Sequence, residues 1–330
     1  MENDARHLDF LVSLARAYYE QGLTQEQIAR NMAISRSQIS RYLSQAREIG
    51  IVQIRVVAPD ERVDTLSAQL RERFETLRAA IVVPVFSRDD QFIRQMVGSA
   101  CASYLKGAIH PNECLCIGCG RTVRKAIEAL KSHPVAGLSV VQAMGSVGHE
   151  ALEIDFNELT RAAAAAFRAR PYYLNAPAIL GSGTAAALEA ANASIHESLE
   201  RARQADVFLV GLGSLESDLL YARAGLITQA NIRWLQDRHV AGDICGHFLD
   251  RKGNEHPTPF SERIVGISLP DLRRARLSIG VAGGSDKALP LYGALAGGWI
   301  NVLVTDDQTA RAILELDVEA KGGVAAQNPI

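Results

Sequence analysis

Beyond residue 78 the sequence alternates short apolar runs with stretches that have helical periodicity. This alternation is typical of a mostly parallel β-sheet with helices on both faces. The chain has 330 residues, 48% of them hydrophobic, so it can bury a large core. We therefore expect an α/β domain in this part of the chain. Its expected strands are 80–85, 114–118, 139–143, 172–174, 206–211, 243–248, 264–268, 277–282 and 301–305.

The N-terminal segment has a different pattern and predicts an all-α domain of three short helices. Residues 8–21 place apolar side chains on one helical face. Thr24 starts a second helix, and Gln27 three residues later completes a capping box. Ser35 caps a third helix over 36–49.

Two short helices joined by a tight turn, with the small Ala29 at the close approach, predict a helix-turn-helix. In the second of these helices Ile39, Leu43 and Ala46 point to the core, and the polar side chains point outward as in a major-groove reader. Arg and Gln can contact base edges, and Ser can reach phosphates or bases. The alternative is a solvated helix in a small bundle. The residues predicted to contact double-stranded DNA are Thr24, Gln25, Ser35, Arg36, Ser37, Gln38, Ser40 and Arg41.

We place the domain boundary between residues 57 and 58. An extended segment with Ile51, Ile54 and Val56, closed by Pro59, ends the first domain. An amphipathic helix over 60–77 follows, and it either docks on the second domain or forms a coiled-coil seam. The apolar stripe of this helix consists of Val63, Leu66, Leu70, Phe74 and Leu77.

The composition limits the partners. Lys and Arg total 35 and Asp and Glu 37, so any basic surface has to be local. No apolar run approaches the ~20 residues that cross a bilayer, and the N-terminus does not resemble a signal peptide, so we expect a cytoplasmic protein with no membrane partner. Cys114, Cys116 and Cys119 are interpreted as apolar packing residues, and we expect neither a metal nor a cofactor.

Four turns that follow expected strands are rich in Gly and small polar residues. The turn 118–122 opens a helix, so its amides and the Thr122 hydroxyl can hold an anion with the helix dipole behind them. Lys287 is the most isolated positive charge of these turns. Neither the dinucleotide fingerprint nor a Walker motif is present, which favours a small phosphorylated or polyhydroxylated ligand. The turn residues predicted to bind it are Gly118, Cys119, Gly120, Arg121, Thr122, Gly145, Ser146, Gly211, Gly213, Gly283, Gly284 and Lys287.

Asp243, His247 and Asp250 lie around another expected strand. We predict that Asp243 binds ligand hydroxyls. The three residues are also the one cluster that offers a general acid and base, which an enzyme would need.

Several motifs, taken in order, resemble the SorC family of bacterial transcriptional regulators. Its DNA-binding part is matched by GLTQ at 22–25, ISRYL at 39–43 and AREIGIV at 46–52. Its sugar-binding domain is matched by GCGRT at 118–122, GLGS at 211–214, GDI at 242–244, GGSDK at 283–287 and NVLVTDDQTA at 301–310. The resemblance spans nearly the whole chain, and the motif order makes it specific.

The resemblance implies a repressor or activator of carbohydrate genes that a sugar, polyol or sugar-phosphate effector controls. It also implies that residues 58–330 form an effector and oligomerisation domain similar in fold to sugar-phosphate isomerases and deaminases. In this interpretation Gly120, Thr122, Gly283, Gly284 and Lys287 hold a phosphate or terminal hydroxyl, and Asp243 binds sugar hydroxyls.

Two positions depart from the family pattern. Ala33 stands where the tight turn often has Gly, and Met144 lies near the position at which some relatives have a lysine, so imine chemistry is not available there. The hypothesis of a regulator gives a function to both halves of the chain. The alternative, a sugar-phosphate isomerase or deaminase-like enzyme, gives no function to residues 23–55. Because helix-turn-helix proteins usually bind two half-sites, we expect a homodimer or homotetramer.

Overall fold

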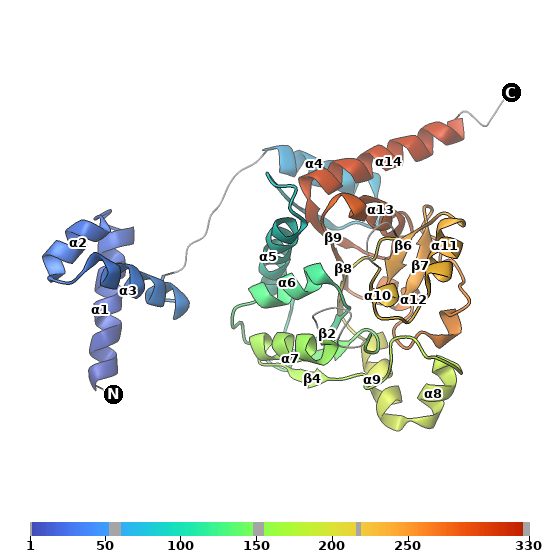
Figure 1. The fold of residues 1–330 in the computed structure, drawn as a ribbon, viewed down its shortest axis with the longest axis horizontal. Helices are drawn as coiled ribbons and strands as arrows, with labels where there is room; N and C mark the ends of the chain where they lie inside the picture. The colour runs from blue at the N-terminus through green and yellow to red at the C-terminus, as the bar shows by residue number, and fades with distance from the viewer. Residues whose placement is uncertain (1, 53–60, 148–154, 216–218, 326–330) are drawn as a thin grey trace. The chain divides into compact units, whose positions relative to one another are not determined.

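The computed structural model describes residues 2–52, 61–147, 155–215 and 219–325 (Figure 1). The chain divides into two compact units, Met1–Pro59 and Asp60–Ile330. The boundary predicted between residues 57 and 58 lies outside the described residues, as do Ile54, Val56 and Pro59 of the predicted extended segment and Asp60 of the helix expected to follow it.

The first unit is a three-helix unit, with α1 at Glu2–Tyr19, α2 at Gln25–Met32 and α3 at Arg36–Glu48. The capping box predicted at Thr24 is confirmed, and the cap predicted at Ser35 is part of a second capping box. Thr24 Oγ1 accepts from the Gln27 amide at 3.2 Å, while Gln27 Oε1 accepts from the Thr24 amide at 2.8 Å. Ser35 and Gln38 exchange the equivalent bonds at the start of α3. The buried apolar side chains of the unit include Leu11, Leu14, Ile28, Ile39, Leu43 and Ala46.

The turn between α2 and α3 contains a strained residue. Ala33 has a φ of 54°, in the left-handed region, and its amide donates to the Ala29 carbonyl. An L-residue other than Gly, Asn or Asp loses roughly 1–2 kcal/mol in this conformation. The short turn is therefore set by the two capping boxes and the apolar contacts around it, against the local preference of Ala33.

The second unit is built on a seven-stranded sheet in which every adjacent pair is parallel. The strands are β1 Ala79–Val83, β2 Cys114–Ile117, β3 Ser139–Gln142, β4 Arg170–Tyr172, β5 Val207–Val210, β8 Leu277–Val281 and β9 Val302–Asp306. The helices are α4 Glu61–Arg73, α5 Asp90–Ala108, α6 Arg121–Ala129, α7 Phe156–Phe167, α8 Ala185–Ala191, α9 Ala193–Arg203, α10 Leu220–Arg223, α11 Gln229–Gln236, α12 Leu269–Arg274, α13 Ala288–Ala296 and α14 Asp307–Ala325, with 3₁₀ turns η1 Ser261–Arg263 and η2 Ser285–Lys287.

The strand order is β1-β9-β8-β5-β2-β3-β4. From β2 the chain adds β3 and β4 on one side, and β5 then lies on the other side of β2 and leads to β8 and β9. The order reverses between β2 and β5, and loops that leave two such strands diverge to opposite faces of the sheet. A gap therefore opens at the carboxyl ends of β2 and β5.

Two predicted strands are wrong. The stretch 243–248 is an antiparallel hairpin, β6 Val240–Ile244 with β7 His247–Asp250, because Cys245 and Gly246 turn the chain with φ values of 51° and 88°. Residues 264–268 form no strand; Ile264 and Gly266 make isolated bridges to Ile179 and Met144. Both stretches are apolar enough to be buried, which is why they resembled strands.

The helix predicted over 60–77 is docked on the second unit. α4 contacts β1 and α14, and it ends at Arg73, four residues earlier than predicted. Leu66, Leu70 and Leu77 of the predicted stripe are buried in the core of this unit, so they are not available for a coiled-coil seam. None of the described helices is both long and apolar enough to cross a membrane.

The strain at Ala33 yields a prediction. Ala33→Gly should stabilise the first unit by about 0.5–1 kcal/mol, because Gly adopts the left-handed region without a Cβ penalty but has more freedom to lose on folding. Hydrogen exchange of the α1–α3 amides in the full chain measures this local stability. Ala29→Gly, in the interior of α2, is the matched control and should destabilise the same amides by a similar amount. If exchange in Ala33→Gly is no slower than in the unmodified chain, Ala33 is not strained.

Candidate functional site

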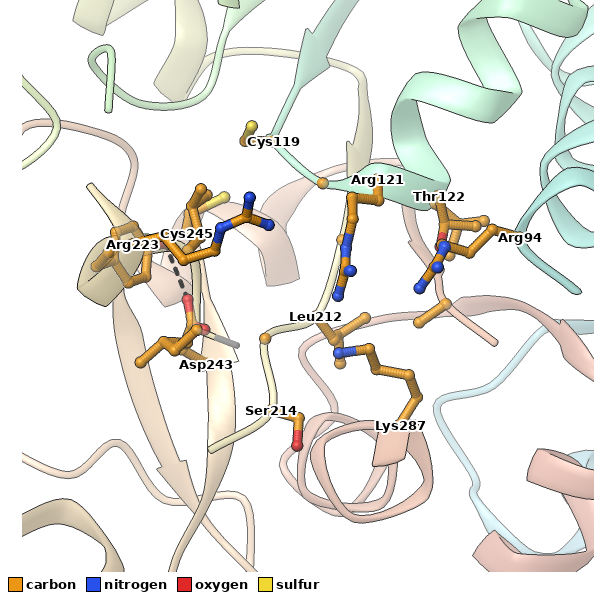
Figure 2. A pocket seen from close by; sticks show the side chains of 18 of the residues that line it. Arg94, Cys119, Arg121, Thr122, Leu212, Ser214, Arg223, Asp243, Cys245 and Lys287 are labelled. Carbon is orange, nitrogen blue, oxygen red and sulfur yellow. Dashed lines mark hydrogen bonds between the residues drawn. The ribbon is translucent and has the colours of Figure 1, made fainter. Parts of the chain in front are cut away.

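A pocket lies at the carboxyl edge of the sheet, over the gap between β2 and β5 (Figure 2). Loops that follow β2, β5 and β8 contribute to its wall, together with the β6–β7 hairpin, α5 and α10. Eight of the residues predicted to bind a ligand line it. They are Cys119, Gly120, Arg121, Thr122, Gly211, Gly213, Asp243 and Lys287.

Four cationic side chains line this pocket: Arg94 of α5, Arg121 of α6, Arg223 of α10 and Lys287 of η2. In Figure 2 the cationic groups of Arg94, Arg121 and Lys287 point toward the same space. Burial and the charge of Arg121 lower the pKa of Arg94, although Asp90, whose Oδ2 lies 3.5 Å from Arg94 Nη1, opposes the shift. Positive charge is therefore concentrated here, and it favours an anionic ligand group.

The N-terminus of α6 adds to this field. Gly120 is the N-cap residue and has a φ of 155°, and no side chain caps the helix there. The first amides of α6 therefore point at the pocket without a side-chain acceptor, and the positive end of the helix dipole faces it. Thr122, which is buried in the first turn, supplies a hydroxyl to the same wall.

The sequence predicted that Lys287 is an isolated positive charge, and this prediction is wrong. Its Nζ lies 2.9 Å from Asp286 Oδ2, and its side chain is only 12% exposed. Asp286 holds the ammonium at the pocket wall, so a ligand has to compete with that carboxylate for it.

Asp243 lies on the opposite side of the pocket from Lys287 (Figure 2). Its carboxylate is buried and accepts hydrogen bonds from the Tyr221 hydroxyl at 3.0 Å and from the Gly246 amide at 2.9 Å. Burial raises the pKa of Asp243, and these two donors and Lys287 counteract the shift. The carboxyl group is thus a fixed hydrogen-bonding group, suited to hydroxyls of a ligand.

Gly213 makes this arrangement possible. Its backbone pairs with Asp243 through two hydrogen bonds, of 3.0 and 3.1 Å. A Cβ on Gly213 would lie only 1.8 Å from Asp243 Oδ1. Gly is required at this position because the loop after β5 approaches the carboxylate so closely.

The remaining predicted turn residues do not line the pocket. Gly145 and Ser146 follow β3. The Gly145 amide donates to the Val265 carbonyl, and Ser146 pairs with the backbone of Ala176 and Ala178. A Cβ on Gly145 would lie 2.5 Å from the Ala176 carbonyl oxygen. Gly118, Gly283 and Gly284 also lie outside the lining.

The Gly283–Gly284 turn is tied to β9 instead. The Gly284 amide donates to Asp306 Oδ2 at 2.8 Å and to Thr309 Oγ1 at 3.1 Å. The turn therefore positions Lys287, and its own glycines serve the connection to the sheet.

His247 and Asp250 do not line the pocket. His247 contacts Glu255 through Nδ1 at 2.6 Å and the Ile267 carbonyl through Nε2 at 2.8 Å. Asp250 accepts from the Lys252 and Asn254 amides and closes a turn. The structure therefore does not bring these two residues together with Asp243 as an acid–base group.

The residues predicted to contact DNA lie on α2, on α3 and at the N-caps of these two helices. All of them are exposed except Gln25, which is half-buried. The side chain of Gln38 is already engaged, because its Oε1 accepts from the amide and the hydroxyl of Ser35. Gln38 can therefore donate to a base through its NH₂ group, whereas a bidentate contact requires the cap to open.

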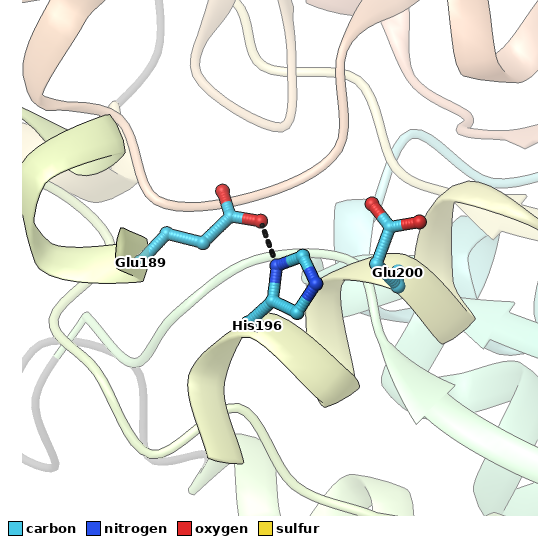
Figure 3. A group of neighbouring side chains, drawn as sticks. All are labelled: Glu189, His196 and Glu200. Atoms are coloured by element: carbon cyan, nitrogen blue, oxygen red, sulfur yellow. Dashed lines mark hydrogen bonds and ion pairs between the residues drawn. The ribbon is translucent and has the colours of Figure 1, made fainter. Parts of the chain in front are cut away.

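One group of side chains has the composition of a metal site among the described residues: Glu189, His196 and Glu200 (Figure 3). The guanidinium of Arg203 donates to both carboxylates, at 2.7 Å and 2.8 Å, and the two glutamates raise its pKa. His196 Nδ1 lies 3.0 Å from Glu189 Oε1. The group is an ion-pair network that joins α8 to α9.

The five cysteines are free thiols, and three of them, Cys101, Cys116 and Cys245, are buried. Burial raises the pKa of Cys116, Cys119 and Cys245, so these thiols stay protonated near neutral pH. Cys116 is fully buried in β2, whereas Cys119 and Cys245 line the pocket.

Comparisons with known proteins agree with this architecture. Residues 59–315 match the family model described as "Putative sugar-binding domain". The chain is 32% identical over 305 residues to the deoxyribonucleoside regulator of Bacillus subtilis, with 92% of this chain and 96% of that protein covered. It is 32% identical over 332 residues to the sorbitol operon regulator of Klebsiella pneumoniae, and the match covers 96% of this chain and 100% of that regulator.

The solved structure of that full-length regulator, SorC, superposes with a TM-score of 0.74 at 31% identity and covers 93% of this chain and 98% of SorC. This chain belongs to the SorC family of transcriptional regulators. The fold class predicted from the sequence is confirmed.

Sequence reasoning missed several lining residues of this SorC-family pocket. Arg94 and Arg223 lie on helices and not in Gly-rich turns, so a search of strand ends does not find them. Arg94 does carry a signal, since it is the single charged residue between Asp90 and Lys106. The other missed lining residues include Met144, Leu212, Leu219, Tyr221 and Cys245.

The contact between Gly213 and Asp243 yields a prediction. Gly213→Ala should destabilise the second unit by about 1–3 kcal/mol, the usual cost of overpacking. In an Asp243→Ala background the same substitution should cost clearly less, because the clashing carboxylate is gone. Both tryptophans, Trp234 and Trp299, lie in the second unit, so fluorescence during urea unfolding of the full chain reports on that unit. Equal costs in the two backgrounds would contradict the close contact.

Proposed function

We propose that this SorC-family regulator binds double-stranded operator DNA through its first unit and a small sugar, polyol or sugar-phosphate effector in the pocket of its second unit. The observation that carries the effector proposal is the convergence of three cationic groups and the α6 N-terminus on one space, opposite a buried carboxylate. Cations and free amides suit a phosphate, and Asp243 with Tyr221 suits hydroxyls. A phosphorylated sugar or polyol satisfies both ends of the pocket.

The lining favours binding over catalysis. Among the described lining residues Asp243 is the one carboxylate, and no histidine is present. The thiols of Cys119 and Cys245 have raised pKa values, which disfavours a nucleophilic thiolate. We therefore propose that the protein is not an enzyme, and that binding shifts its affinity for DNA.

The DNA proposal rests on the outward face of α3. Arg36 and Arg41 are exposed there, as are Ser37 and Ser40, while Ile39 on the same helix is buried. One relative is named a sorbitol operon regulator and another a deoxyribonucleoside regulator, which supports operators of carbohydrate genes as the targets. We place the protein in the cytoplasm, where the DNA is, and propose a homodimer or homotetramer that matches two half-sites.

Arg41→Ala should weaken binding to a cognate operator by roughly 1–3 kcal/mol and relax specificity at one base pair. Arg16→Ala is a suitable control, because Arg16 lies on α1 outside the predicted reading face. Titration of both variants into operator and random duplexes at fixed salt measures the difference. Equal losses of Arg41→Ala on both duplexes would contradict base reading.

The effector prediction starts from a thermal-shift screen of the full chain with sugars, polyols and their monophosphates, because a ligand of the native state raises the melting temperature. Lys287→Ala should then require roughly ten- to a hundredfold more of the best phosphorylated ligand to change operator binding, corresponding to about 1.5–3 kcal/mol for a charge-assisted hydrogen bond. Operator affinity without ligand should be unchanged.

Lys125→Ala is the matched control, since Lys125 lies on α6, pairs with Glu128 at 2.7 Å and does not line the pocket. Superimposable titrations for Lys287→Ala and the unmodified protein would show that Lys287 does not contact the ligand. Catalytic turnover of that ligand would contradict the proposal that the protein is not an enzyme.

A further inference from the structure

The outer face of α5 is unusually apolar for a helix surface. Phe92 and Met96 are 45% and 36% exposed, and Phe86 in the loop before the helix is 88% exposed. These are three of the large apolar side chains that the described residues expose. Large exposed apolar groups that lie together mark interaction surfaces.

The same face lacks charge over most of its length. Arg94 is the single charged residue between Asp90 and Lys106, and it lines the pocket on the inner side of the helix. Phe92 and Met96 share the outer face with Ser99, Ser103 and Gly107, because residues spaced three, four or seven apart lie on one side of a helix.

The distribution of size along this outer face is uneven. The large side chains lie in the N-terminal half of α5, and the small ones lie in the C-terminal half. Two such helices in antiparallel orientation can place Phe92 of one copy against Ser103 of the other, and Met96 against Ser99. The register that matches these pairs also matches Asp89 with Lys106.

We infer that the outer face of α5 is an interface between two copies of this chain, packed antiparallel about a two-fold axis. The face is complementary to itself in both size and charge, as an isologous contact requires. Asp89 is exposed at the helix N-terminus and Lys106 lies in the last turn, so the pair forms twice across the axis. Antiparallel orientation also places the opposite ends of the helix dipoles side by side.

A double cysteine variant tests the register. In Phe92→Cys/Ser103→Cys the two thiols are about 16 Å apart along one helix, too far for an internal disulfide. Mild oxidation of the full chain should therefore give cross-linked dimers on a non-reducing gel. Phe92→Cys/Ala186→Cys is the control, with the second thiol on an exposed position of α8, and should cross-link much less.

Met96→Glu tests the contribution of the face to association. It should raise the dissociation constant of one association step at least about tenfold in sedimentation velocity of the full chain, because it places a charge in an apolar contact. Val318→Glu, on an α14 side chain that is 60% exposed, should leave association unchanged. Unchanged association in Met96→Glu, or cross-linking no stronger than in the control, would overturn the inference. If a different protein covers this face of α5, the chain alone should show neither the cross-link nor an effect of Met96→Glu on its association.

Discussion

The reversal of strand order between β2 and β5 is the constraint on which the site depends. A parallel sheet brings the carboxyl ends of its strands to one edge, and loops that lead from adjacent strands to the same face of the sheet leave no gap between them. Where the order reverses, the helices diverge and the edge opens. The loop after β2 then leads into α6, and the loop after β5 passes against Asp243 of the β6–β7 hairpin. Residues distant in sequence meet there because of topology.

Electrostatics determine what this opening favours. Several cations in a partly buried site lose hydration and repel one another. The pKa of Arg94, which is lowered first by burial and then by the charge of Arg121, reflects both costs. Asp286 and Asp90 offset part of the repulsion through ion pairs with Lys287 and Arg94. An anion that enters the pocket would offset more of this repulsion. Because the fold does not need these cations for its own stability, their presence favours a binding role.

The sequence predicted the local features well because they depend on local chemistry. The caps at Thr24 and Ser35 follow from side-chain hydrogen bonds over three residues, and most of the strands follow from apolar runs. Arg94 was missed because its role depends on which way α5 faces, and tertiary packing decides that. Gly145 resembled a ligand-binding glycine, although it is required by the close approach of the Ala176 backbone.

Most of the other site errors have the same origin. A Gly-rich turn after a strand has the same sequence pattern whether its amides face a ligand or the backbone of another loop. The hairpin at Cys245 and Gly246 could not be distinguished from one buried strand, because buried apolar residues such as Ile244 and Phe248 lie on both sides of the turn. Such distinctions require knowledge of which segments pack against each other.

The pocket is assembled from residues between Arg94 and Lys287, which span much of the second unit. A chain in which this unit is unfolded therefore has no binding site, and any ligand of the pocket stabilises the folded chain by RT ln(1 + [L]/Kd), about 2.7 kcal/mol at a hundredfold excess over Kd. Unfolded chains are the ones that cellular proteases remove. The supply of ligand thus affects how long each copy survives in the cell, and so the number of copies present.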